Sequence, residues 1–318
     1  MRKNRTIFNA LITLVLSLFG YQSHAQEADQ IWFEAARRMA SANSSDEMRS
    51  ILSETVPGFL QTIEFDAQNN RDLLNLWGKS RNIDESHLSD GKRTVPANIL
   101  QFFNSILNVS YDSTFIYGHA GLTHTYGYLM SNLQTPFGFK RARYVAGEIE
   151  AGFGMSQGLF SGRPSQGTLL SNLTCFAGRI AFRDHPAMAK SMNCAVQEIS
   201  GFAFQQLKPT RLVERIIDQE FMLELRTDIV PFTQDQSNGR NTHLLIYSID
   251  YHARGQASQP RLITVFPVQK RFMDGVFAAS GLGDHQPIRL KYNAALADSI
   301  PSEKMTGKRF IADEKHKN

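Results

Sequence analysis

The chain has 318 residues, of which 42% are hydrophobic and 20% are charged. This composition excludes wholesale disorder and allows a buried core, and the length suits one large domain or two ordinary ones. The formal net charge is +4, which is too small to indicate a strongly basic protein.

Residues 1–25 have the layout of a secretory signal peptide. Three cationic residues precede an apolar run over residues 7–19, and the Ser-His-Ala tripeptide at 23–25 resembles a cleavage site. The apolar run is shorter than the ~20 residues that span a membrane. We therefore expect cleavage after Ala25 and an exported protein, periplasmic or secreted, with no integral membrane segment in the mature chain. The alternative is a signal anchor that stays attached.

Removal of residues 1–25 takes away three cationic residues and no acidic one, so the formal charge falls from +4 to +1. Proteins that bind nucleic acid usually carry a strong basic patch. A nearly neutral mature chain therefore gives no reason to expect a nucleic-acid partner. A small-molecule or cell-envelope ligand fits the expected compartment.

Cys175 and Cys194 are the two cysteines of the chain. Outside the cytoplasm an even pair is most simply one disulfide bond, which would stabilise the fold by ~3 kcal/mol. Two alternatives remain. Both thiols are free and buried, or Cys175 is a catalytic nucleophile with His243 as its base and Asp250 as the orienting residue.

Helical patterns dominate the first part of the chain. Apolar residues recur at helical spacing over residues 27–42. A second helix begins near Ser44, because Ser44 and Glu47 have the three-residue spacing of a capping box. Residues 78–94 are polar and predict a surface loop. Pro96 suits the first turn of a further helix that ends near Asn108.

The middle of the chain is rich in glycine and aromatic residues. Residues 113–117, 124–129 and 143–153 suit strands. Residues 168–181 suit either a helix or a strand, and residues 186–204 look helical.

From residue 212 onward the pattern becomes rich in β-formers. The stretch 212–225 begins with helical spacing. Short β-rich runs follow at residues 223–232, 243–252, 262–268 and 288–292. Turn-prone segments separate the first three of these runs, which indicates an antiparallel meander rather than alternating strands and helices. The charged tail after Pro301 is expected to fray.

These patterns predict an α+β fold, with a helical N-terminal layer packed on a mainly antiparallel β-sheet in the C-terminal half. The expected divisions are a signal peptide at 1–25, a helical region at 26–110, a Gly/aromatic central segment with the sheet region at 111–300, and a charged tail at 301–318. We expect 26–110 and 111–300 to form one domain.

The pentapeptide Gly154-Met155-Ser156-Gln157-Gly158 matches the nucleophile-elbow pattern, in which glycines flank a serine in a crowded, strained turn. The pattern requires a strand before the serine and a helix after it. An extended run precedes the pentapeptide, but Pro164 and further glycines argue against a helix after it. The alternative is a Gly-rich loop between strands.

A serine nucleophile also needs an acid and a histidine, in that order along the chain. Asp228 or Asp250 can supply the acid, and His252 or His285 the base. We assign Ser156, Asp250 and His252 as the catalytic candidates.

Histidines in the central segment are candidate ligand-binding residues. His119 and His124 are five residues apart, and an Asp-His pair follows at 184–185. On one regular strand the first two would face opposite sides, and the spacing matches no zinc signature. We therefore expect no metal and no cofactor, and retain His119 and His124 as candidates for hydrogen bonding to a ligand.

Arg141 and Arg143 form part of a cationic cluster in the same segment. On a strand they would share a face, from which they could grip a carboxylate, phosphate or sulfate. We take both as candidate ligand-binding residues. The alternatives are that the cluster is a solvated face, or that it pairs with internal acids such as Glu148 and Glu150.

Two functions follow from these candidates. The first is an exported hydrolase with a serine nucleophile that acts on an ester or other polar substrate. The second is a non-enzymatic periplasmic or secreted protein that binds a ligand or assists another protein. A histidine within hydrogen-bond reach of Ser156 would favour the first function.

Overall fold

The computed structural model describes residues 26–78, 95–109, 126–132, 140–192, 194–217, 221–234, 242–270, 274 and 310–315. The predicted signal peptide lies outside these residues. The fold is α+β, with the helices mainly N-terminal and an antiparallel sheet in the C-terminal half, as predicted. Within the described part of the chain, none of the helices has both the length and the apolar character needed to cross a membrane.

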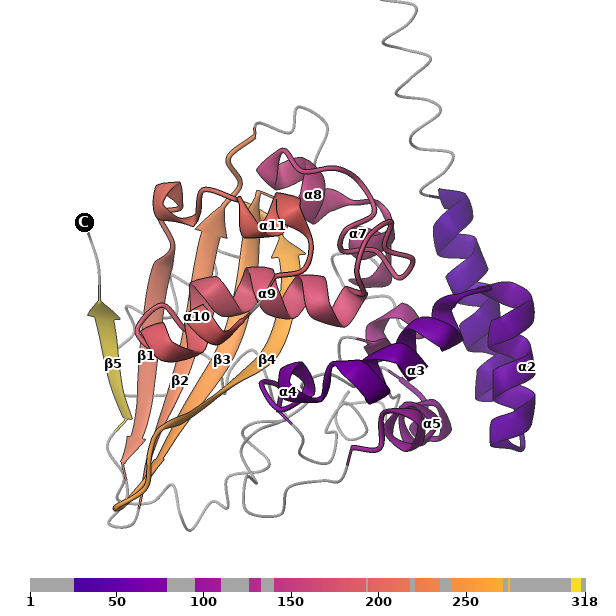
Figure 1. Ribbon diagram of the computed structural model, residues 1–318, viewed down its shortest axis with the longest axis horizontal. Coiled ribbons are helices and arrows are strands. Elements are labelled where there is room, and N and C mark those ends of the chain that lie inside the picture. Colours follow the sequence, from indigo (N-terminus) through magenta and orange to yellow (C-terminus); the bar gives the residue numbers. More distant parts are fainter. Residues whose placement is uncertain are drawn as a thin grey trace, which may run out of the picture.

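Five antiparallel strands form one sheet in the order β4-β3-β2-β1-β5 (Figure 1). The strands are β1 (Thr210–Ile217), β2 (Phe221–Pro231), β3 (His243–Ala253), β4 (Gln259–Val268) and β5 (Phe310–Lys315). Strands β2, β3 and β4 confirm the antiparallel meander predicted from the runs at 223–232, 243–252 and 262–268, because consecutive strands are neighbours. Strand β1 adds a neighbour on the β2 side that was not predicted. The expectation that the tail frays is wrong for β5, which pairs with β1.

The helical start predicted for residues 212–225 is also wrong, because β1 and the first half of β2 occupy this stretch. Both faces of β2, β3 and β4 are buried over most of their length. In β3, for example, residues 244–250 are buried at every successive position. Strands buried on both faces lack strict alternation of polar and apolar residues, so periodicity alone does not separate them from helices.

The N-terminal half is helical, beginning with a helix over residues 26–40. It continues with α2 (Ser45–Thr55), α3 (Phe59–Asn69), α4 (Arg71–Leu74) and α5 (Ala97–Leu107). The predicted cap of α2 is confirmed, since Ser44 Oγ accepts a hydrogen bond from the Glu47 amide at 3.2 Å. Phe59 is the centre of this half's core and packs edge-on against Trp32, Phe103 and Tyr126.

Trp77 joins the helical half to the sheet. Its indole is fully buried, and Nε1 donates a hydrogen bond to Thr174 Oγ1 at 2.7 Å. The neighbouring backbone lies along β4, because the Gly78 amide donates to Leu262 O at 2.8 Å and the Leu262 amide donates to Leu76 O at 2.7 Å. The two halves are therefore tied through both a side chain and the backbone.

Helices replace two strands predicted for the central segment. Residues 126–129 are helical, and residues 143–153 lie mostly in α7 (Lys140–Val145) and α8 (Glu148–Phe153). Glycines bound α8, since Gly147 and Gly154 both have left-handed backbone angles, with φ of 66° and 67°. Glycine adopts this region without steric strain. The predicted strands at 113–117 and 288–292 lie outside the described residues.

One long helix, α9 (Leu169–Ala181), lies across one face of the sheet (Figure 1). Residues 168–181, for which the sequence allowed either a helix or a strand, are therefore helical from Leu169. Thr168 and Ser171 form a reciprocal capping box at its start. The region predicted to be helical at 186–204 forms three short pieces, α10 (Pro186–Ser191), α11 (Gln197–Ser200) and a 3-10 turn (Phe204–Gln206).

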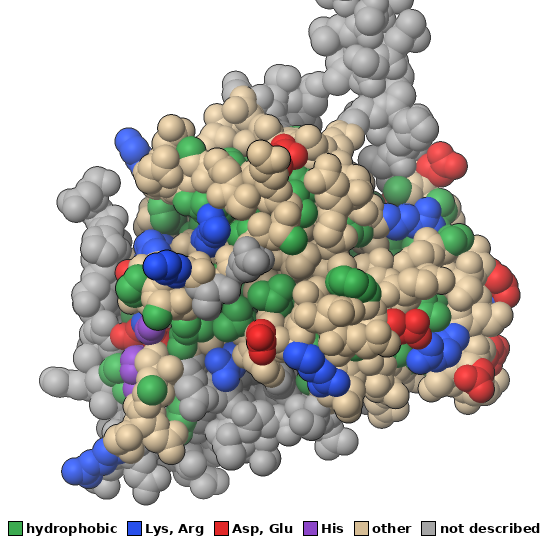
Figure 2. Space-filling view, viewed as in Figure 1, with side chains coloured by type: hydrophobic (Ala, Val, Ile, Leu, Met, Phe, Trp, Pro, Cys, Tyr) green, Lys and Arg blue, Asp and Glu red, His purple; other side chains and the backbone are tan. Residues whose placement is uncertain are grey.

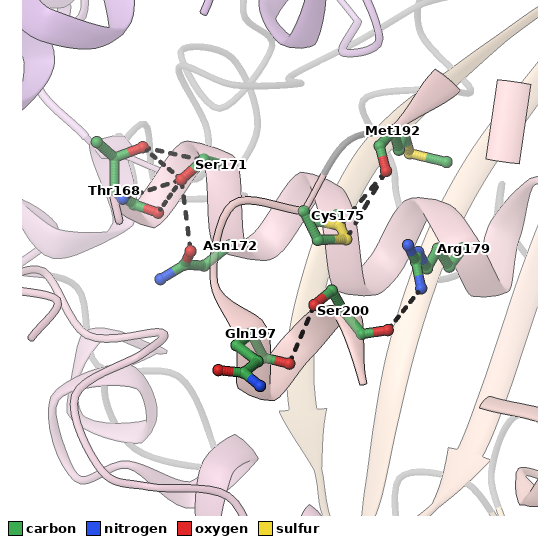
Figure 3. Close-up of a disulfide and its surroundings, with 9 residues drawn as sticks. Thr168, Ser171, Asn172, Cys175, Arg179, Met192, Gln197 and Ser200 are labelled. Atoms are coloured by element: carbon green, nitrogen blue, oxygen red, sulfur yellow. Dashed lines mark hydrogen bonds between the residues drawn. A yellow bond between two sulfur atoms is a disulfide. The ribbon is translucent and has the colours of Figure 1, made fainter. Parts of the chain in front are cut away.

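A disulfide bond between Cys175 and Cys194 joins α9 to the segment before α11 (Figure 3). The two Cα atoms are 5.7 Å apart, within the usual range for a disulfide. Arg179, one turn after Cys175, donates to the Ser200 carbonyl at 3.3 Å. The predicted pairing is confirmed, and it holds α11 against α9.

Removing this disulfide should lower the free energy of unfolding by about 3 kcal/mol, because the unfolded chain regains the freedom of the closed loop. Urea unfolding of the Cys175→Ser, Cys194→Ser double variant measures this loss. Adding a reductant should destabilise the wild type and leave the double variant unchanged. Two titratable thiols in the unreduced, denatured protein would contradict the bridge.

Candidate functional site

The candidate site lies on the sheet face that α9 covers. Alternate residues of a strand share a face, and β2 places Glu224, Arg226 and Asp228 on this one. All three are buried. The register sets Glu224 directly opposite Asp250 on β3, and His252 follows two residues later on the same face. An unusual number of charged groups therefore gathers inside the fold.

We call the charged group at one end of this face the Asp250 cluster. Its members are Glu224 and Arg226 from β2, Asp250 and His252 from β3, His185 at the start of α10, and Ser258 in the turn before β4. Local residues determine the backbone path of the two segments outside the strands. Pro186 at the first position of α10 directs the chain out of His185, and Gly255 has a φ of 75° in the β3–β4 turn.

Asp250 is the centre of the cluster and is fully buried. Its Oδ2 lies 2.9 Å from His185 Nε2, 2.8 Å from Arg226 Nη2 and 3.3 Å from His252 Nε2. Ser258 Oγ donates a hydrogen bond to the other oxygen, Oδ1. A buried carboxylate without partners would be strongly destabilising, so these four contacts explain how the fold tolerates it.

His185 contacts two groups with conflicting demands. Its Nε2 lies 2.9 Å from Asp250 Oδ2 and 3.1 Å from Arg226 Nη1. One ring nitrogen either donates a hydrogen bond or accepts one. It therefore satisfies the carboxylate or the guanidinium, and not both at once.

The cluster reaches solvent through its histidines. The side chains of His185 and His252 are 21% and 30% exposed, whereas that of Asp250 is 0% exposed. Figure 2 shows histidine side chains at the surface beside acidic ones, at the left of the view. The two imidazoles therefore form the partly exposed side of the cluster, while its central carboxylate is buried.

A second charged network lies beside the cluster. Arg211 on β1 makes a bidentate contact with Asp228, with Nε–Oδ1 at 2.8 Å and Nη2–Oδ2 at 2.9 Å. Arg183 also contacts Asp228 Oδ1 at 2.7 Å, and Arg211 Nη2 donates to Ala181 O at 2.6 Å. These contacts fix the end of α9 on the sheet, so Asp228 serves the fold rather than a serine.

The structure does not bring Ser156 to His252. Gly152, four residues before Ser156, accepts a hydrogen bond from the Thr233 amide at 2.9 Å, which places this loop near the His243 end of β3. His252 lies nine residues further along the strand, a distance of about 30 Å at ~3.4 Å per residue. Of the three catalytic candidates, Asp250 and His252 alone come together.

The loop around Ser156 has a structural explanation. Ser156 is exposed, and its amide donates to Glu198 Oε1 at 2.6 Å. Residues 154–168 form turns and bends, so the helix that a nucleophile elbow needs does not follow. Glu150 is buried under this loop and accepts a hydrogen bond from the Phe160 amide at 2.8 Å, and burial raises its pKa. Gly158 is also left-handed, with a φ of 88°.

The structure directs Arg141 and Arg143 inward. Both are buried and lie in α7 rather than on a strand. Arg141 Nε contacts Asp29 Oδ1 at 2.6 Å, and Arg143 Nη1 donates to Pro267 O at 2.8 Å. Burial lowers the pKa of both guanidinium groups. Both arginines therefore make internal contacts, as one of the two alternative interpretations expected. The acid that pairs with Arg141 is Asp29, and not Glu148 or Glu150.

The remaining candidates are three histidines and the Cys175 thiol. His119, His124 and His285 lie outside the described residues. Cys175 is bonded to Cys194, which removes the free thiol that the Cys175–His243–Asp250 alternative requires.

Sequence reasoning missed Glu224, Arg226 and Ser258. A signal for the first two was present, because charged residues occur at every second position of an otherwise apolar strand. Such a pattern places charge on a single face, and Asp250 and His252 repeat it on β3. Ser258 lies in a turn and offered no comparable signal.

Comparisons of the chain with protein-family models, with curated proteins and with solved structures find no match. The geometry of the Asp250 cluster is therefore the basis for a functional proposal.

Proposed function

We propose that this chain is an exported accessory protein that binds a cation at the Asp250 cluster. The observation that carries the proposal is the buried Asp250 carboxylate, which faces the Glu224 carboxylate and is flanked by two partly exposed imidazoles. Carboxylate oxygens and neutral imidazole nitrogens are the commonest cation ligands in proteins. The cluster thus has ligand atoms, and its two imidazoles reach the surface.

Export is supported by the sequence of residues 1–25 and by the disulfide bond. Disulfides persist mainly outside the cytoplasm, and the N-terminal segment has the order of charge, apolar run and small residues of a signal peptide. A binding function is preferred over serine chemistry because the loop that carries Ser156 lies near the His243 end of β3, and His252 lies near the other end.

Cation binding predicts that at least one of CaCl2, MgCl2, MnCl2 and ZnCl2 raises the melting temperature of the purified chain at constant ionic strength. A ligand that binds only the native state stabilises it by mass action. The rise should disappear in Asp250→Asn, because one carboxylate of the site is lost. It should persist in Asp274→Asn, since Asp274 is exposed and pairs with Lys270 at the surface.

A fluorophosphonate probe of serine nucleophiles forms a second arm of this experiment. Wild type and Ser156→Ala should show the same background labelling. No stabilisation by any of the four salts, or an undiminished rise in Asp250→Asn, would contradict cation binding. Labelling that disappears in Ser156→Ala would restore the hydrolase with a serine nucleophile.

A further inference from the structure

We infer that the cation is a transition metal of the Zn²⁺ type, held by Glu224, Asp250 and His252. This inference rests on the proposed cation-binding function and names its ligand. One ligand atom from each of the three side chains can be chosen so that all lie within 4.8 Å of one another.

The sheet register creates this arrangement. Glu224 and Asp250 are direct partners across β2 and β3, and His252 lies two residues beyond Asp250 on the same face. Two neighbouring strands therefore present three ligands to one point. Since sheet hydrogen bonds fix both strands, the ligands are held close together before any ion arrives.

The environment of His252 Nε2 distinguishes a ligand from a hydrogen-bonding group. This nitrogen is buried and has no hydrogen-bond partner among the described residues. It nevertheless lies 3.3 Å from Asp250 Oδ2, a close contact without hydrogen-bond geometry. Adjacent ligand atoms of a tetrahedral zinc site, with bonds of ~2.0–2.1 Å, are about 3.3 Å apart. The pair therefore has the spacing of two ligands of one metal.

The ligand types favour zinc over the hard cations. Ca²⁺ takes six to eight oxygen ligands, and Mg²⁺ keeps an octahedral shell of oxygens. One imidazole and two carboxylates fit Zn²⁺, which accepts nitrogen and oxygen in a four-coordinate site. The three side chains supply three of the four ligands, and a water molecule would complete the site.

The surrounding contacts resemble the outer partners of metal ligands. Ligating carboxylates are usually hydrogen-bonded in turn, and Asp250 accepts such a bond from Ser258 at Oδ1. His185 contacts Oδ2 of the same carboxylate from α10. Both contacts would orient Asp250 toward Glu224 and His252.

Arg226 occupies the position between the two carboxylates. Its Nη2 contacts Glu224 Oε2 and lies 2.8 Å from Asp250 Oδ2. The guanidinium marks this position as one that favours a positive charge. A metal ion would need the same oxygens, so Arg226 and Zn²⁺ should compete, and Arg226 should turn away when the metal binds.

Titration of EDTA-treated protein with ZnCl2, by calorimetry and by melting temperature, tests the inference. We expect one Zn²⁺ per chain and a larger rise in melting temperature than CaCl2 or MgCl2 produces. His252→Ala should bind Zn²⁺ about tenfold more weakly or worse, given the sensitivity of metal sites to such losses. His243→Ala is the matched control, because His243 lies on the same strand at its other end.

Competition with Arg226 gives a sharper test. Arg226→Ala should unfold at a lower temperature than wild type, because the two carboxylates lose the cation between them. ZnCl2 should raise its melting temperature more than that of wild type, and adding His252→Ala should abolish this rescue. Should Arg226→Ala not fold, Arg226→Gln serves the same purpose, and Glu224→Gln tests the third ligand in the wild-type background.

Co²⁺ gives a readout of the ligand geometry itself. We expect visible absorption of a four-coordinate Co²⁺ site that His252→Ala removes and His243→Ala retains. Equal stabilisation by Ca²⁺, Mg²⁺ and Zn²⁺ would overturn the zinc inference and leave cation binding standing. Stabilisation by none of the ions overturns both, and Zn²⁺ binding that survives His252→Ala overturns the assigned ligands.

Discussion

Replacing Asp228 with alanine should lower the free energy of unfolding by about 3–5 kcal/mol, the usual result of breaking one side of a buried ion pair. Asp228 and Arg211 are both buried and joined by two hydrogen bonds. Without the carboxylate, Arg211 keeps its charge inside the fold with two backbone carbonyls and a partly exposed acid as partners. Urea unfolding followed by circular dichroism measures the change.

Asp184→Ala is the matched control for Asp228→Ala. Asp184 contacts the same arginine but is 55% exposed, so its loss should lower the free energy of unfolding by less than about 1 kcal/mol. Equal losses in the two variants would show that burial does not decide the strength of this network. A negligible loss in Asp228→Ala would show that Arg211 finds other partners.

Replacing Trp77 with alanine should have an effect of similar size, about 3–5 kcal/mol. The indole is fully buried where the helical half meets the sheet, so its removal leaves a large cavity. The same change also leaves Thr174 without its indole donor. Urea unfolding followed by circular dichroism gives the loss, and Trp32 remains as a fluorescent probe of the helical half.

Thr174→Val separates the hydrogen bond from the packing. It removes the acceptor of the Trp77 indole and keeps a side chain of similar shape, so the expected loss is about 1–3 kcal/mol from one unsatisfied buried donor. Trp77→Ala should lose more than Thr174→Val. The reverse order would show that the hydrogen bond, rather than the buried indole, joins the two halves.

Local patterns predicted the parts of the fold that local interactions decide. Ser44 and Glu47 predicted the start of α2, because an N-cap depends on neighbouring residues alone. The meander of β2, β3 and β4 followed from β-rich runs separated by turns. The cysteine pair followed from its number and compartment.

Tertiary context decided the parts that were wrong. Residues 143–153 were predicted to be a strand, yet Gly147 and Gly154 bound a short helix there. In β1, Leu212 and Val213 are buried at successive positions, so the alternation of buried and exposed residues that identifies a strand is absent there. No local pattern indicated that residues 310–315 would find an edge of the sheet, since that pairing depends on a partner about a hundred residues away.

The site was predicted in part, for a related reason. Asp250 and His252 were chosen as partners for Ser156, and their closeness follows from spacing two residues apart on one strand. Their companions come from other segments. Glu224 depends on the register between β2 and β3, and His185 depends on how α10 lies on the sheet. Neither the strand register nor the position of α10 on the sheet can be read from the sequence.

Residues 76–78 have a consequence for the outer edge of β4. The edge strand of a sheet offers unpaired N–H and C=O groups to strands of other molecules, and exposed edges promote aggregation. Here the amide and carbonyl of Leu262 are already bonded to Leu76 and Gly78 of the same chain. The connection between the two halves therefore also occupies this edge at Leu262, and loosening it would free these backbone groups for intermolecular pairing.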